Sequence, residues 1–126
     1  MAGRLSTRRW NDPAIAGEGT RILVCRFRPR GVRREDEPWD EWWKDLGPSV
    51  ELHAAAYGKH AAPIDFAEYR RRYVAEMADG LSQYHLRALK ARVAAGEDLV
   101  LLCSSACTDD KRCHRSVLCE LALGLP

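Results

Sequence analysis

The stretch LVLLCSSACTDDKRCHRSVLCELAL, residues 99–123, decides the fold. It opens with four consecutive apolar residues, Leu99–Leu102, which are typical of a buried strand in a parallel sheet. A polar loop follows, and an amphipathic helix is expected to begin near Cys113 and His114. Open α/β sheets place binding and catalytic groups where a strand leads through a loop into a helix. We therefore expect the chemistry of the protein to lie in this stretch.

Two other segments have the character of strands. Arg21–Phe27 is apolar and β-branched at its centre, and the less apolar Leu5–Trp10 favours an edge strand. Because helical segments separate Arg21–Phe27 from Leu99–Leu102, we predict that these two strands are parallel neighbours. The expected fold class is α/β, a small mostly parallel sheet of three to four strands surrounded by helices. It forms a single domain over residues 1–126, with residues 1–4 outside the ordered part.

Four helical segments are expected between these strands. The first begins at Pro38 and has Trp39, Trp42, Trp43 and Leu46 on one face. The second runs from Ser49 to Tyr57 and is capped by Gly58. The third follows Asp65, with Phe66, Tyr69, Tyr73 and Met77 facing the core, and the fourth runs from Leu81 to Ala95. Tryptophans can stack on nucleic-acid bases, but we interpret this cluster as core. His85 is likewise interpreted as a hydrogen-bonded core histidine rather than a ligand.

The composition is that of a globular domain. The chain has 126 residues, of which 46% are hydrophobic, and no apolar run approaches the roughly 20 residues of a membrane helix. The N-terminal residues lack the apolar region of a signal peptide. An odd number of cysteines, five, argues against a disulfide framework. We therefore expect a cytoplasmic protein with no membrane partner.

Charge is distributed unevenly although the net charge is only +2. Residues 1–34 carry nine arginines and two acids, a local charge of +7, and residues 35–51 carry a local charge of −6. Residues 1–34 could bind a nucleic acid or another anion. Pairing with the acidic block, or simple solvation, is the interpretation that we favour. Nucleic-acid binding is accordingly expected to be weak and strongly salt-dependent.

Cys113 and His114 are the candidate catalytic residues. A helix N-terminus with Arg112 and Arg115 beside it favours a thiolate or a bound anion. In this interpretation Cys113 is a nucleophile or redox thiol and His114 is an acid or base. The alternative is that Cys113 is a half-buried small residue and His114 a helix cap.

A zinc site is a second interpretation of the same residues. Cys103, Cys107, Cys113 and His114 could supply four ligands, but the spacing C-x3-C-x5-C-H is irregular for a structural site. No second CxxC pair accompanies it. We place zinc below the anion site, and no cofactor is part of the leading prediction.

The predicted anion site combines residues that follow the two most apolar strands, Arg21–Phe27 and Leu99–Leu102. If they are parallel, Arg26 and Arg30 lie at the same sheet edge as Cys103, Ser104 and Arg115. These residues would bind a small anionic ligand, phosphate-like or nucleotide-like. A solvated arginine-rich loop is the alternative. The leading function is an anion-binding domain, with thiol-dependent catalysis left open, and the alternatives are a nucleic-acid-binding module or a zinc-stapled interaction domain.

The run RILVCRFRPRG, residues 21–31, resembles the signature RVLVDRLWPRG of YeaO-like proteins, a bacterial family built on a domain of unknown function. The similarity continues, in order, through Trp39–Trp42, Pro48-Ser49 with Glu51-Leu52, Phe66–Tyr73 with Glu76, and Leu101-Leu102 with Ser105-Ala106 and His114. A Leu-Cys and Cys-His-Arg ending is frequent in the wider family and matches Leu102-Cys103 and Cys113-His114-Arg115.

Two positions depart from the YeaO-like pattern. Cys25 stands where the signature has Asp, and the Cys-His-Arg ending stands where YeaO-like chains often have Asn-His. The resemblance implies a small α/β domain with a site around the arginine and Cys-His-Arg positions. It implies no particular reaction.

Overall fold

A four-stranded sheet and four α-helices make up the fold, seen in a computed structural model that describes residues 2–107 and 112–124. In chain order the elements are β1 (Leu5–Arg9), β2 (Thr20–Leu23), the 3-10 turn η1 (Arg34–Asp36), β3 (Glu41–Trp42), the 3-10 turn η2 (Lys44–Leu46), α1 (Val50–Tyr57), α2 (Phe66–Glu76), α3 (Gly80–Ala94), β4 (Leu99–Cys103) and α4 (His114–Leu123). Among these residues no helix is long and apolar enough to cross a membrane.

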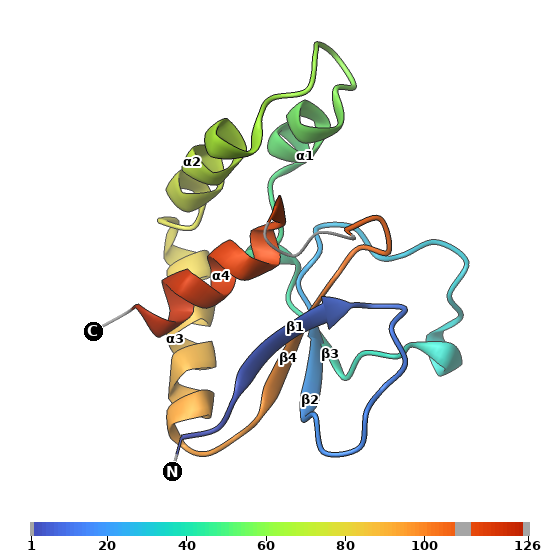
Figure 1. Ribbon diagram of the computed structural model, residues 1–126, viewed down its shortest axis with the longest axis vertical. Helices are drawn as coiled ribbons and strands as arrows, with labels where there is room; N and C mark the ends of the chain where they lie inside the picture. Colours follow the sequence, from blue (N-terminus) through green and yellow to red (C-terminus); the bar gives the residue numbers. More distant parts are fainter. Residues whose placement is uncertain (1, 108–111, 125–126) are drawn as a thin grey trace.

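The sheet is entirely parallel, with the strand order β1-β4-β2-β3 (Figure 1). All five residues of β4 are buried, because β4 has a strand on each side and core side chains pack on both faces of the sheet. Leu101 is the register partner of Thr7 on β1 and of Ile22 on β2. The predictions of an α/β fold, of an edge strand near residue 5, and of parallel neighbours are confirmed.

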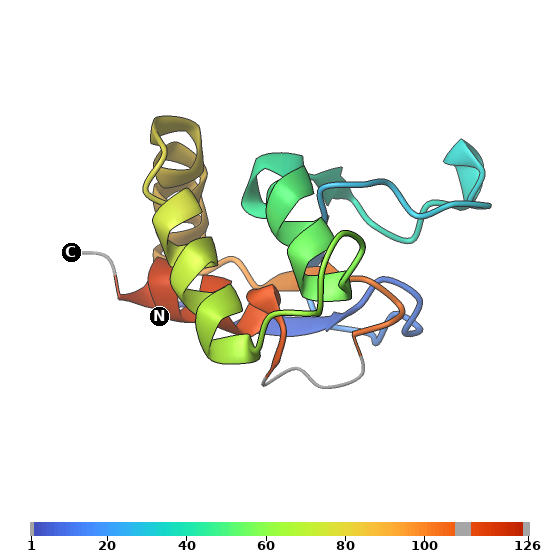
Figure 2. The same ribbon diagram turned by 90° about the horizontal axis from the view of Figure 1, so that it is seen from above.

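One face of the sheet carries the main core, and helices cover it (Figure 2). Ile22, Leu99 and Leu101 on that face pack with apolar side chains from all four helices. Loops cover the other face, where Trp39 packs with the partly buried Trp10 over the remaining β2 and β4 side chains. The carboxyl ends of the strands lie between the helices on one face of the sheet and the loops on the other.

The segment after Pro38 is not the helix that its apolar spacing predicts. That prediction is wrong because the chain runs extended along β2: the backbone N–H of Asp40 donates to Arg21 O at 2.8 Å and that of Trp43 donates to Leu23 O at 2.9 Å. Trp39 and Trp43 lie in or against the core as expected, whereas Trp42 is 38% exposed.

The second strand is also shorter than predicted. β2 ends at Leu23, and the chain then turns because the backbone of Arg26 lies against Gly47, where an added Cβ would be 2.3 Å from Arg26 N. The Arg26 guanidinium donates to the carbonyl oxygens of Gly47 and Pro48 at 3.2 and 3.1 Å. The last backbone bond of this strand to β4 runs from Val24 N to Leu102 O at 3.0 Å.

The helix caps that the sequence predicts at Ser49, Asp65 and Gly58 are present in the structure. Ser49 and Asp65 accept hydrogen bonds from Leu52 N and Glu68 N, and Gly58 ends α1 with a left-handed φ of 68°. His85 bonds Asp45 through Nδ1 at 2.6 Å, as expected of a hydrogen-bonded histidine, but its side chain is 23% exposed and lies at the margin of the core. Near the chain start, Gly3 N donates to Val93 O at 2.7 Å.

Candidate functional site

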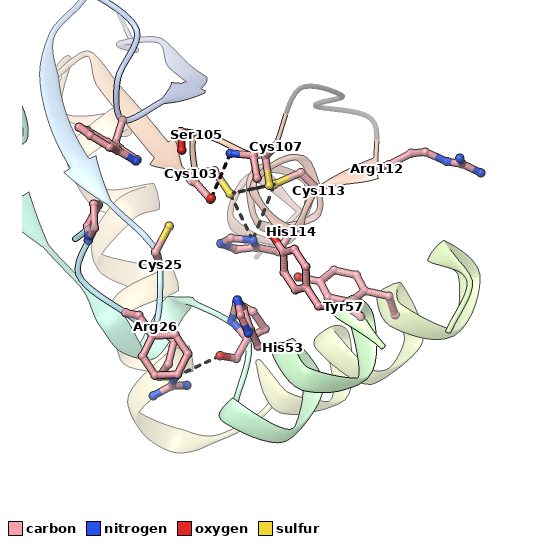
Figure 3. Close-up of a pocket in the computed structure, with 18 of the residues that line it drawn as sticks. Cys25, Arg26, His53, Tyr57, Cys103, Ser105, Cys107, Arg112, Cys113 and His114 are labelled. Carbon is pink, nitrogen blue, oxygen red and sulfur yellow. Dashed lines mark hydrogen bonds between the residues drawn. The ribbon is translucent and has the colours of Figure 1, made fainter. Parts of the chain in front are cut away.

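A cavity of about 1080 Å³ opens at the carboxyl ends of β2 and β4. The segment 25–30 after β2, the segment 103–107 after β4, and residues of α1 and α2 form its walls. Cys113 and His114, at the start of α4, also line it (Figure 3). Because the strands are parallel, this is the edge where the sequence places a binding site.

Three thiols gather at one side of this cavity. The Sγ atoms of Cys103 and Cys113 are 3.0 Å apart, and Cys107 Sγ is 3.3 Å from each of them. Cys103 ends β4, Cys107 closes a turn in which its N–H donates to Ser104 O, and Cys113 is the N-cap of α4. We call Cys103, Cys107, Cys113 and His114 the Cys-His cluster.

His114 completes this cluster from the first turn of α4. Its Nε2 lies 2.7 Å from Val24 O, and its Nδ1 is 3.7 Å from the Sγ atoms of both Cys103 and Cys113. Burial lowers the pKa of His114, so the ring is neutral. A carbonyl can only accept, so Nε2 carries the proton and the lone pair of Nδ1 faces the thiols.

The close contacts among the three thiols shift their pKa values in different directions. Hydrogen bonds from Cys103 and Cys113 lower the pKa of Cys107 to about 3. The contact with Cys103 lowers the pKa of Cys113, but the bond to Cys107 and burial outweigh it and raise that pKa to about 12. The contacts with Cys107 and Cys113 raise the pKa of Cys103. These shifts favour the thiolate on Cys107, whereas the helix-start argument predicts it on Cys113.

The basic residues predicted for the anion site have different surroundings. Arg30 is exposed at the cavity edge, and Arg26 lines the cavity but has Nε and Nη2 bound to the 47–48 turn. Ser104 lines the cavity and accepts a bond from Ala106 N. Arg115 is not among the lining side chains, so the structure does not bring it to the anion site.

Arg115 is instead buried beside the Cys-His cluster, with 5% of the residue exposed. Its Nη2 donates to Cys107 O at 3.3 Å, while Nε and Nη1 have no partner in the described part of the chain. Among the described residues no carboxylate pairs with it. A buried cation of this kind is costly unless negative charge lies nearby.

Several cavity residues were missed by sequence reasoning. Phe27, His53 and Tyr57 form a contiguous row of rings, with centroids 5.4 Å apart for the first pair and 4.7 Å for the second. Phe27 is 50% exposed and Tyr57 52% exposed. The available signal was the spacing of His53 and Tyr57, four residues apart on one helical face. Lys59, which follows α1, also lines the cavity.

Comparison with known proteins assigns the family. The family described as "Active DUF488-N3 subclade" (DUF488-N3a) matches residues 5–123, nearly the whole chain. The chain belongs to the DUF488 family. The uncharacterized protein YeaO of Escherichia coli K12 is 36% identical over 117 residues, covering 92% of this chain and 94% of YeaO. The uncharacterized proteins Mb3100c of Mycobacterium bovis and Rv3073c of Mycobacterium tuberculosis H37Rv are each 34% identical over 107 residues, 85% of this chain and 83% of theirs.

The resemblance to YeaO-like proteins is thus confirmed. No solved structure matches the chain significantly. Within the fold, the signature segment 21–31 of this DUF488 protein forms β2 and one wall of the cavity. Cys25, at the position of the signature Asp, lines the same cavity.

Proposed function

We propose that the cavity binds a small anion of the phosphate or nucleotide type. The observation that carries this proposal is the charge of the lining. Among the described residues of the lining, five side chains are cationic, and the negatively charged groups are Asp65 and the Cys107 thiolate. Asp65 is occupied as the N-cap of α2 through its bond to Glu68 N. A concave surface with this charge balance raises the local concentration of anions.

Two of the cations are best suited to contact a ligand. Arg30 and Lys59 are exposed and line the cavity, whereas Arg28 pairs with Glu37 at 2.8 Å. Figure 3 shows Arg112 extending away from the Cys-His cluster. Guanidinium and ammonium groups bind phosphate oxygens through charge-assisted hydrogen bonds.

The row of Phe27, His53 and Tyr57 extends the proposal to a ligand with a planar ring. Exposed aromatic rings are costly to solvate, and here they border a cavity. A nucleobase can stack on such rings with a gain of about 1–3 kcal/mol. The same cavity therefore has cationic groups for the phosphate of a nucleotide and aromatic rings for its base.

Calorimetric titration with inorganic phosphate, adenosine and adenosine 5′-monophosphate tests the proposal. We expect the monophosphate to bind most tightly and the double variant Arg30→Gln/Lys59→Gln to lose at least about tenfold in affinity for it. Tyr57→Ala should weaken binding of the nucleotide and leave binding of phosphate unchanged. The double variant Arg71→Gln/Arg87→Gln, exposed and outside the cavity lining, is the matched control. Absence of binding by all three probes at millimolar concentration would contradict the proposal.

A thiol-dependent reaction remains a prediction that the binding proposal does not require. Cys113 is only 3% exposed, and Nε2 of His114 is bound to Val24 O. A reaction at Cys113 would therefore need the ligand to reach the cavity floor, with Nδ1 of His114 as its proton acceptor. The cytoplasmic location also remains a prediction, and the free cysteines agree with a reducing compartment.

A further inference from the structure

We propose that the Cys-His cluster binds one Zn²⁺ ion through three sulfurs and one nitrogen. This metal site lies in the wall of the cavity and does not depend on which anion the cavity takes. Zn²⁺ prefers four tetrahedral ligands drawn from cysteine sulfur and histidine nitrogen. Cys103, Cys107, Cys113 and His114 supply that set from three segments: the end of β4, the following loop and the start of α4.

Five of the six distances between the ligand atoms are close to those of such a site. With bonds of about 2.3 Å to sulfur and about 2.0–2.1 Å to nitrogen, a tetrahedral site separates its sulfurs by about 3.8 Å and sulfur from nitrogen by about 3.6 Å. The three sulfurs are 3.0–3.3 Å apart, and the two distances from Nδ1 of His114 are 3.7 Å. The group whose ligand atoms all lie within 4.8 Å of one another comprises Cys103, Cys113 and His114. Cys107 lies outside that group, so binding of the ion requires its Sγ to move toward Nδ1 of His114. The sulfurs need to separate by less than about 1 Å to admit the ion.

His114 is oriented as a metal ligand. In metal sites the second ring nitrogen of a histidine ligand usually donates to a carbonyl or carboxylate, which fixes the tautomer. Here Nε2 donates to Val24 O at 2.7 Å, and the edge-on ring of Tyr73, with centroids 5.5 Å apart, packs against the imidazole. The lone pair of Nδ1 is therefore held toward the sulfurs.

The charge of the surroundings gives an independent argument. A Zn²⁺ ion with three thiolates and one neutral imidazole has a net charge of −1. Arg115 is a buried cation whose Nη2 bonds the carbonyl oxygen of the ligand residue Cys107. Its Nε and Nη1 lack partners among residues 2–107 and 112–124. The anionic metal complex would supply the negative charge that a buried guanidinium needs. Binding of the ion releases the thiol protons to solvent.

Metal analysis of the full-length protein, purified under reducing conditions, is the first test. We expect about one zinc ion per chain. After removal of the metal, titration with Co²⁺ alone should give the visible bands of tetrahedral cobalt and a thiolate-to-cobalt charge-transfer band, with an end point of one equivalent. A reduced wild-type protein that binds Co²⁺ without the charge-transfer band, or does not bind it, would overturn the proposal.

Variants locate the ion within the cluster. Cys107→Ser should lower the affinity for Co²⁺ more than about 100-fold, beyond the usual effect of an outer partner. Cys119→Ser is the matched control, because Cys119 lies on α4 outside the cluster and should retain wild-type affinity. Equal affinity in Cys107→Ser and Cys119→Ser would overturn the assignment.

Alkylation rates of the wild-type protein test the same proposal without relying on the folding of a variant. Zinc should slow alkylation of Cys103, Cys107 and Cys113, and a chelator should restore it, while the rates of Cys25 and Cys119 stay unchanged. Peptide mass spectrometry measures all five rates. Zinc-independent rates, or a mass showing a disulfide between Cys103 and Cys113 in the freshly isolated protein, would contradict a metal site.

Discussion

The hydroxyl of Tyr73 donates a hydrogen bond of 2.6 Å to the carbonyl oxygen of Leu46, joining α2 to the turn η2. Both residues are completely buried. Tyr73→Phe leaves that carbonyl without its partner in the core, so we expect the free energy of unfolding to fall by about 1–3 kcal/mol. Urea denaturation of the wild type and the variant measures the difference.

Tyr69→Phe is the matched control for this prediction. Tyr69 lies one turn earlier on α2, with its ring parallel to that of Tyr73 at 6.3 Å, and is only partly buried. We expect a change smaller than about 0.5 kcal/mol. Equal destabilisation by the two variants would show that the Leu46 bond contributes nothing specific.

Gly19 should tolerate no side chain. Its φ is 112°, and an added Cβ would lie 2.2 Å from the carbonyl oxygen of Asp98, at the entry to β4. Gly17 also has a positive φ, 79°, but an added Cβ there meets nothing within 4 Å. We expect Gly17→Ala to cost about 1 kcal/mol, and Gly19→Ala clearly more, because it adds a backbone clash to the same strain. Thermal denaturation compares the two, and equal melting temperatures would refute the close approach.

Stability should depend on pH through His53. Burial, and then the charge of Lys59, lower the pKa of His53 from its ordinary 6.5. Between pH 6.5 and the lower folded-state pKa, the unfolded chain binds a proton that the folded chain does not. The free energy of unfolding should therefore fall as the pH decreases through this window, and level off below the folded-state pKa. Urea melts over a pH series measure the slope.

His53→Gln should make this slope shallower. His60→Gln provides the control because His60 is exposed, and its curve should run parallel to that of the wild type. A His53→Gln curve indistinguishable from that of His60→Gln would rule out the contribution of His53.

Nucleic-acid binding should be weak. The basic N-terminal third is largely paired within the fold: Arg8 and Arg21 both bond Glu18 at 3.1 Å, and Arg33 bonds Asp36 at 2.7 Å. Fluorescence anisotropy with a labelled 20-base-pair duplex should give a Kd above about 1 μM at physiological salt, weakening steeply as salt rises. Nanomolar, sequence-dependent binding would show that these arginines leave their carboxylates for phosphates.

The parallel sheet could be predicted because its signal is local. Leu99–Leu102 is too short and apolar for anything but a buried strand, and the caps Ser49 and Asp65 specify helix starts through their own side chains. The 39–46 segment could not be predicted this way. Its tryptophan spacing satisfies a helical pattern, but hydrogen bonds to β2, which depend on the whole fold, determine its conformation.

The site was predictable in its location but not in its electrostatics. The cysteines and His114 could be assigned to one sheet edge from strand order and chain position. The burial of Arg115 and the contacts of Cys113 with two other thiols depend on how α4 packs. The helix N-terminus considered alone predicts a thiolate at Cys113, whereas the contacts among the three thiols lower the pKa of Cys107.

The central position of β4 has a consequence for the order in which the chain folds. β1 and β2 do not pair with each other, and both bond to β4, which comes after α3 in the chain. During synthesis the first two strands therefore leave the ribosome long before their common partner exists, and only the short β2–β3 pairing is available to them. The nascent protein carries unpaired strand edges until residues 99–103 emerge, so a chaperone that shields such edges would act in that interval.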